Sequence, residues 1–251
     1  MNVVDNGAEI EIVLRSASDV ADRVIMIAAL CRRAFLETRR DDLFDVDPLE
    51  EYFDLCLWLR EENLESLLTD RERDLIQAPL GEASPGLVVT ASWQTEALVA
   101  LGWGLGLTPV MPLYDHVADP ACLMRDIPSP WEKTASFRQR ARLRDEAVIA
   151  TAREEAELWY WRAEAATAVD ASRNFDRASL TAAIRDVARE ALGTGVLPTL
   201  VRGDFPVQDL PYRDVSPTEV ATLAAIAASR LRALNWLCGF GSTWDDAPLD
   251  V

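Results

Sequence analysis

The residues that most need a chemical explanation stand near the end of the chain, in the stretch GSTWDDAPLDV. Trp244 is followed directly by Asp245 and Asp246, and Asp250 lies close behind them. Carboxylate oxygens are ligands that suit Mg²⁺ and Mn²⁺, so this stretch is a candidate metal site. It is also a candidate for a segment that docks on a partner, or for a clamp in which Trp244 closes the fold. The sequence leaves all three alternatives open.

The composition limits the chemistry that the rest of the chain can supply. The chain has one histidine, His116, and one lysine, Lys133. No glycine-rich turn precedes Lys133, which argues against a phosphate-binding loop, and no Gly-x-Ser-x-Gly elbow accompanies His116. A typical zinc site built from cysteine and histidine is equally disfavoured. Any catalysis would have to rest on carboxylates, arginines, tyrosines or an oxygen-ligated metal.

The charge of the chain restricts its partners. The formal net charge is -17 at pH 7, which opposes nucleic acid and anionic lipid and favours a basic protein. The N-terminus carries acids rather than a basic secretory start, and the longest near-apolar run, 97–110, is too short to span a bilayer. The four cysteines are widely spaced without a Cys-x-x-Cys pair. These features predict a cytoplasmic protein with no nucleic-acid or membrane partner. They leave its oligomeric state open.

The spacing of apolar residues predicts a mainly α protein with about seven helices. We expect an N-terminal extension over residues 1–14 and a single helical domain over residues 15–251. One short β-hairpin is expected, either from EIEIV near the start or from the arm 196–212, where glycine and proline interrupt alternating apolar residues.

Capping residues predict where the helices begin. Ser16, Asp47, Thr69 and Ser216 each precede an apolar-periodic segment, and Ser92 is expected to cap the apolar run that follows it. Further helical structure is expected to restart at Ser129-Pro130-Trp131-Glu132, and long helices are expected at about 145–169 and 176–192. After Asp47 the expected inner stripe is Leu49, Phe53, Cys56 and Leu57. In the helix at 145–169 it is Val148, Ala152, Ala156, Trp159 and Ala163.

Four stretches in combination resemble the bacterial family called domain of unknown function 4272. They are RSASDVADR at 15–23, SWQTEALVALGWGLGL at 92–107, LRDEAVIATAREEAELWYWRAEA at 143–165, and the run from GDFPVQDLPY to the end of the chain. The family has a Glu-Arg-His triplet in its last helix and ends in Thr-Asp-Thr. Here the corresponding residues are Ser229-Arg230-Leu231 and Leu249-Asp250-Val251, so a catalytic role for the triplet is not implied. The family name implies no activity.

The positions that match the family signature are polar or aromatic residues on largely apolar segments. They are Trp93, Glu96, Trp161, Arg162, Arg230, Asn235, Trp236, Trp244, Asp245 and Asp246. Because an unpaired buried charge costs several kcal/mol, we expect Glu96 or the aspartates to meet Arg162 or Arg230 if these groups lie inside.

Two functions fit these residues. In the first, Trp244 fills a groove, Asp245 and Asp246 accept hydrogen bonds from arginines or helix N-termini, and no cofactor is needed. The chain is then a non-enzymatic acidic module that binds a basic partner, such as a toxin neutralised by an immunity-like protein. In the alternative, Asp245, Asp246 and Glu96, with Asp250, hold Mg²⁺ or Mn²⁺. A metal-bound water would then attack a small phosphorylated or ester substrate held by Arg162 or Arg230.

Overall fold

The computed structural model describes residues 12–39, 46–171 and 177–250. It confirms the mainly α class. The helices are α1 (Ala17–Thr38), α2 (Pro48–Glu61), α3 (Asp70–Gln77), α4 (Pro85–Gly104), α5 (Ala121–Met124), α6 (Ala135–Arg140), α7 (Glu146–Ala171), α8 (Arg177–Thr194) and α9 (Pro217–Leu237). Single 3-10 turns lie at Glu65–Leu67 and Tyr212–Asp214.

The expected hairpin lies in the arm 196–212. Strands β1 (Pro206–Val207) and β2 (Leu210–Pro211) pair antiparallel, with Val207 opposite Leu210. The other candidate strand, EIEIV, falls mostly outside the described residues. The backbone N–H groups of Val13, its last residue, and of Arg15 donate to the carbonyls of Cys238 and Leu237 at the end of α9, at 3.3 and 3.0 Å.

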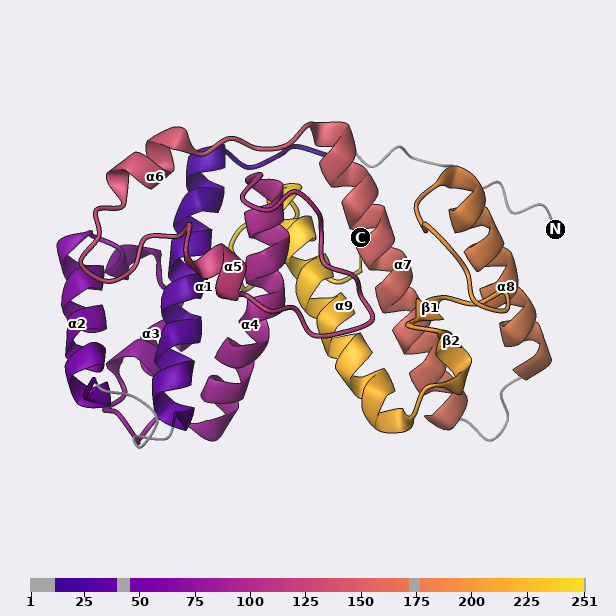
Figure 1. The fold of residues 1–251 in the computed structure, drawn as a ribbon, viewed down its shortest axis with the longest axis horizontal. Coiled ribbons are helices and arrows are strands. Elements are labelled where there is room, and N and C mark those ends of the chain that lie inside the picture. Colours follow the sequence, from indigo (N-terminus) through magenta and orange to yellow (C-terminus); the bar gives the residue numbers. More distant parts are fainter. Residues whose placement is uncertain (1–11, 40–45, 172–176, 251) are drawn as a thin grey trace.

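Four long helices form the centre of the molecule. Figure 1 shows α1, α4, α9 and α7 side by side in that order, with α2 and α3 beyond α1 at one end and α8 beyond α7 at the other. The first and last of the long helices in the chain therefore share one core. Val24, Leu98, Leu231 and Ile149 supply one fully buried side chain from each.

Local capping explains the starts of four helices, α1, α2, α3 and α9. Ser16 accepts from the backbone N–H of Asp19, and Asp47 accepts from that of Leu49. Thr69 with Glu72, and Ser216 with Glu219, form complete capping boxes in which both reciprocal bonds are present. These four predicted starts are confirmed.

Two predicted starts are wrong. α4 begins at Pro85, not after Ser92, and the Ser92 hydroxyl donates to the Val88 carbonyl inside the helix at 2.9 Å. Proline at the first helical position is favourable because its missing N–H would have no intrahelical partner there. At 129–132 a turn replaces the expected helix, since Trp131 has φ +76°, outside the right-handed helical region.

Two expected apolar stripes also need correction. Leu49, Phe53 and Leu57 are exposed (46%, 60% and 43%) and Cys56 is half-buried, whereas the face against the core carries Tyr52, Leu55, Trp58 and Leu59. α2 is apolar on more than one side. On the side that is buried, the polar atoms of the aromatic side chains form hydrogen bonds within the protein. The Trp58 indole N–H donates to the Glu132 carbonyl at 2.8 Å. On α7, Val148 is exposed and Ile149 takes the buried position.

α4 is the most apolar of the helices and packs closely on its neighbours. A Cβ at Gly102 would lie 2.7 Å from the Leu123 side chain, which confirms the expected close approach. Gly106 has open space around it and is needed instead for its φ of +73°. In the described ranges, no helix combines the length and the apolar character needed to cross a membrane.

Candidate functional site

Glu96 on α4 and Arg230 on α9 form an ion pair at the centre of the molecule. Both side chains are 0% exposed, and the Glu96 Oε2 atom lies 2.9 Å from the Nε of Arg230 and 2.7 Å from its Nη2. Arg230 Nη1 also donates to the carbonyls of Pro112 and Leu113, and Glu96 Oε1 accepts from the Ala118 N–H at 2.8 Å. The pairing expected from the sequence is confirmed, and it fixes the loop 112–118 on the two helices.

Tyr114 lies under this pair. The Arg230 guanidinium is 4.6 Å from the centre of the Tyr114 ring, which stacks on Trp159 at 5.4 Å and 9°. Burial raises the pKa of Tyr114 well above its usual value, despite the neighbouring guanidinium. The phenol therefore keeps its proton at neutral pH and is a poor general base.

Arg162 on α7 pairs with Asp204, a residue that the sequence did not single out. Arg162 Nε and Nη2 donate to the two carboxylate oxygens at 2.8 and 3.0 Å, and the backbone N–H groups of Phe205 and Arg213 donate to the same oxygens. Burial by itself would raise the pKa of Asp204. The bonds and charge of Arg162 and the two backbone bonds outweigh burial and hold that pKa below its usual value.

Asn235 connects the C-terminal tail to α7. Its side-chain amide donates to the Pro248 carbonyl at 2.9 Å, and its oxygen accepts from Arg153 Nε at 2.7 Å. Arg153 also donates from its Nη1 to the Glu157 carboxylate, at 3.1 Å. Trp161, on the same helix, is half-buried and packs against the core.

Trp244, in the C-terminal tail, packs against the end of α9. Its ring is buried edge-on against Trp236, with centroids 5.4 Å apart, and the Arg23 guanidinium lies 4.6 Å from its centre. Arg23 is itself paired with Glu72 through two bonds, and both side chains are buried. Trp244 thus fills a groove, as expected for a clamp.

The two acids after Trp244 do not behave as expected. Asp246 is exposed and accepts from the hydroxyls of Ser242 and Thr243, at 2.7 and 2.9 Å, which lower its pKa. Asp245 is exposed, and no arginine pairs with it among the described residues. The reason is geometric: the nearby guanidiniums of Arg15 and Arg23 are directed to backbone carbonyls and to Glu72.

A hollow in two parts lies against Trp244. One part, of about 640 Å³, is lined by α3, α4 and α9 and includes Trp93, and a second part, of about 530 Å³, lies between the start of α1, the start of α3 and the tail. Thr69, Trp244 and Asp245 line both parts. We call this two-part hollow the tail groove. It brings together Trp93, Trp236, Trp244 and Asp245 from the predicted set.

The candidate metal ligands are not gathered into one site. Both Glu96 oxygens are occupied by Arg230 and Ala118, and Asp246 is held in its own turn. Asp250 is exposed and beyond the tail groove. Within the described ranges no three His, Cys, Asp or Glu side chains are placed to share a metal ion.

Among the other buried contacts described above, the sequence missed Arg153, Asp204 and both members of the Arg23–Glu72 pair. Arg23 and Arg153 lie on the apolar faces of α1 and α7, and a charged residue within an apolar stripe is a signal that a partner is required. Asp204 offered no such signal, because it lies in a turn between glycine and phenylalanine, where an exposed aspartate is normal.

A mainly α protein held by buried arginine–carboxylate pairs is the class that the fold defines, and comparison with known families adds a name for the group. The family described as Domain of unknown function (DUF4272) matches residues 3–188, so the chain belongs to that family. The match contains the stretches at 15–23, 92–107 and 143–165, and it ends before the run from Gly203 onward. No curated protein and no solved structure matches the chain.

Proposed function

We propose that this protein is a non-enzymatic, acidic protein-binding module of a regulatory or immunity-like kind, and that it takes a basic segment of its partner in the tail groove. Its place of action on this proposal is the cytoplasm, which agrees with the free thiols of Cys31, Cys56 and Cys238. The partner class follows from charge, since the chain has 42 acidic and 25 basic residues.

The observation that carries the proposal is the rim of the tail groove. Asp19, Asp70 and Asp245 are exposed and line the smaller part of the groove, and none of them forms an ion pair with another described residue. Beneath them lie the apolar atoms of Met26 and Leu68, together with Trp236 and Trp244.

This rim differs from the charges inside the protein. Every buried carboxylate described above faces a guanidinium, whereas these three exposed ones leave a negative site open over an aromatic floor. A lysine or arginine side chain laid into such a site gains both a carboxylate partner and apolar contact for its stem. Asp19 and Asp70 are also in the first turns of α1 and α3, where the helix dipole favours them.

The groove gives no comparable support to a metal-dependent hydrolase. Its walls hold Arg71, Glu72, Arg232 and Asp245, and Glu72 is already paired with Arg23. Asp245 is the one free carboxylate of the larger part, and no three acids of the described residues, Asp19 and Asp70 included, are placed to share a metal ion.

The test uses synthetic peptides as stand-ins for the partner. A helical peptide that presents lysine and leucine on one face is compared with the same peptide carrying glutamate, by surface plasmon resonance at low and high salt. We expect the lysine peptide to bind, and its association rate to fall at least about tenfold when salt shortens the Debye length. The glutamate peptide is expected not to bind.

A matched pair of variants locates the binding surface. Asp19→Asn/Asp70→Asn/Asp245→Asn removes the rim, and Glu50→Gln/Glu61→Gln/Glu82→Gln removes the same charge from exposed residues on other surfaces. The proposal requires that only the first variant loses binding. Equal losses of binding in both variants would show that binding depends on net charge alone, and would reject the groove as the binding site.

A further inference from the structure

A second hollow, of opposite charge, lies at the other end of the molecule. It has a volume of about 250 Å³, lies between α7, α8 and the turn at 201–204, and is lined by Arg162, Arg185, Arg202, Gly203, Asp204 and Arg213 among others. We call it the arginine hollow. Four arginines and one aspartate in one lining are unusual in a chain with a net charge of -17.

The one carboxylate in this lining is already neutralised. Asp204 is buried and receives two bonds from Arg162 and two from backbone N–H groups, so its charge is directed into the floor of the hollow. A new anion entering the hollow would therefore meet the remaining three guanidiniums over a paired floor. With Asp186 and Asp214, which lie near these arginines outside the lining, four guanidiniums face three carboxylates.

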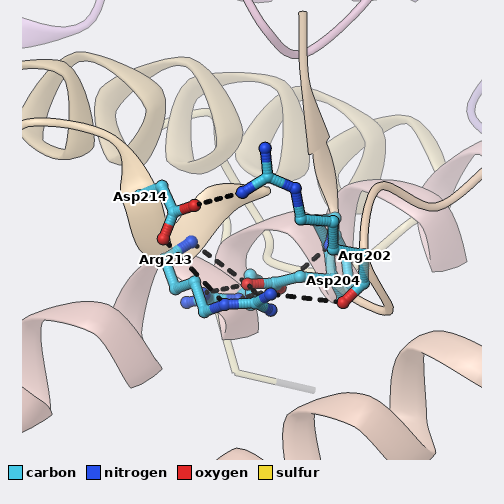
Figure 2. A network of polar contacts seen from close by, with 6 residues as sticks. Arg202, Asp204, Arg213 and Asp214 are labelled. Carbon is cyan, nitrogen blue, oxygen red and sulfur yellow. Dashed lines mark hydrogen bonds and ion pairs between the residues drawn. The ribbon is translucent and has the colours of Figure 1, made fainter. Parts of the chain in front are cut away.

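Those three guanidiniums are held loosely. Arg202 and Asp214 are 3.2 Å apart with side chains 64% and 42% exposed, Arg213 is 3.6 Å from Asp204, and Arg185 is 3.9 Å from Asp186. Figure 2 shows Arg202 and Asp214 joined beside Arg213 and Asp204. Exposed pairs such as Arg202–Asp214 and Arg185–Asp186 contribute little to stability, so these two guanidiniums can turn toward a better anion. Arg213 also donates to the Arg202 carbonyl at 3.3 Å, and its side chain is 44% exposed.

The backbone holds Arg202 in a conformation that arginine rarely adopts. Val201 and Asp204 pair across a two-residue turn, in which Arg202 has φ +49° and Gly203 has φ +76°. Two positive φ values in succession favour Asn-Gly or Gly-Gly, so arginine at the first position is a strained choice. The strained backbone of Arg202 is therefore a second observation about the hollow, and it does not depend on the number of arginines that line it.

The shape of the site indicates the size of its ligand. A volume of about 250 Å³ is below the usual range for drug-sized molecules, which suits a single anionic head group. An adjoining hollow of about 270 Å³ shares Arg162 and Arg213 with it and is walled by Leu180, Tyr212 and Val220. An apolar group attached to the anion has room there.

We propose that the arginine hollow binds the phosphoryl group of a small phosphomonoester, with the organic part in the adjoining apolar hollow. Guanidinium groups bind phosphate oxygens through paired, charge-assisted hydrogen bonds, and a dianion matches several arginines better than a carboxylate does. The site is separate from the tail groove, and its ligand is independent of the partner proposed for that groove.

Isothermal titration calorimetry with phenyl phosphate and with inorganic phosphate, at constant ionic strength and about pH 8, tests the proposal. At this pH a phosphomonoester is a dianion. We expect phenyl phosphate to bind, and to bind more tightly than inorganic phosphate because of the apolar hollow. Equal affinities would make free phosphate the ligand and remove the apolar part of the site from the proposal.

Three variants separate the site from general charge effects. Arg185→Ala and Arg202→Asn should each weaken binding about tenfold or more, since each removes a guanidinium. Arg189→Ala is the matched control, because Arg189 lies one turn from Arg185 on α8, pairs with Asp186 at 3.1 Å and does not line the hollow. Asparagine tolerates a positive φ, so Arg202→Asn should keep the fold while losing the ligand.

The binding results that support the site differ from those that overturn it. Loss of binding in the two lining variants, with Arg189→Ala unchanged and all melting temperatures near that of the wild type, supports the site. An equal loss in all three variants, or no heat of binding for the wild type at millimolar phenyl phosphate, overturns it.

Discussion

The tail groove and the arginine hollow are built alike and carry opposite charges. Each has a buried ion pair as its floor, Arg23–Glu72 under the groove and Arg162–Asp204 under the hollow. Three exposed acids, Asp19, Asp70 and Asp245, line the smaller part of the groove, although exposed Arg71 and Arg232 line its larger part, and three exposed arginines line the hollow. In both regions the buried charged residues form ion pairs that stabilise the fold. The exposed charged residues are accessible to a ligand, so burial distinguishes the two roles.

The largest expected effect comes from breaking a floor. Glu72→Gln or Asp204→Asn leaves a buried guanidinium without a counter-charge, so each should lower the free energy of unfolding by about 3–5 kcal/mol. Urea denaturation followed by far-UV circular dichroism measures it. Asp186→Asn, which breaks an ion pair with Arg189 whose two side chains are 63% and 65% exposed, is the control and should cost at most about 1 kcal/mol. Equal losses in all three would remove the distinction between floor and rim.

The aromatic residues of the two regions should differ in the same way. Trp244→Ala removes a buried ring between Trp236 and Arg23, and should cost about 3 kcal/mol. Tyr212→Phe, under Arg162 in the hollow, removes a buried hydroxyl that has no hydrogen-bond partner among the described residues, so it should leave stability unchanged or slightly raised. Thermal unfolding of the two variants checks both. A destabilised Tyr212→Phe would show that the hydroxyl has a partner after all.

Lowering the pH should reduce the difference in unfolding free energy between the wild type and Asp204→Asn. Because the pKa of Asp204 is lowered in the folded state, its stabilising contribution is complete above the usual aspartate pKa of about 3.9 and is lost as the pH falls toward the lowered value. The gap in unfolding free energy between the two proteins should thus be constant above about pH 5 and narrow below about pH 4. Urea titrations across this range measure it. A gap that stays constant at low pH would contradict the pairing.

The smallest effect is expected at the rim of the hollow. Arg202→Asn relieves an arginine from a positive φ, and should raise the unfolding free energy by about 0.5–1 kcal/mol. Asp245→Asn, at the rim of the groove, should change it by no more than about 0.5 kcal/mol. Differential scanning calorimetry of both variants is sensitive enough. A large loss at either rim would mean that it is part of the fold rather than an open site.

The sequence predicted the parts of the fold that are encoded locally. Capping residues predicted the starts of α1, α2, α3 and α9, because a cap and the backbone N–H that donates to it lie within three residues of each other. The start of α4 was missed because Ser92 resembles a cap in isolation. The inner face of α2 was missed because several of its faces are apolar, and only packing on the core selects one.

The candidate site was predicted in part, and for physical reasons. The Glu96–Arg230 pair followed from the cost of burying a charge on an apolar helix. The expected contacts of Asp245 and Asp246 with arginines were wrong, since these acids stay at the surface. The two hollows could not be predicted, because each is lined by residues from segments that are far apart along the chain.

By itself, the sequence determined the helical class, most helix starts, the scarcity of histidine and lysine, and the acidic charge. These properties depend on composition or on neighbours within one helical turn. Only the tertiary structure decided which charges are paired and which remain open. Pairing requires two side chains to meet within a few ångströms, and for Arg162 and Asp204 that distance is set by how α7 packs against the arm before α9.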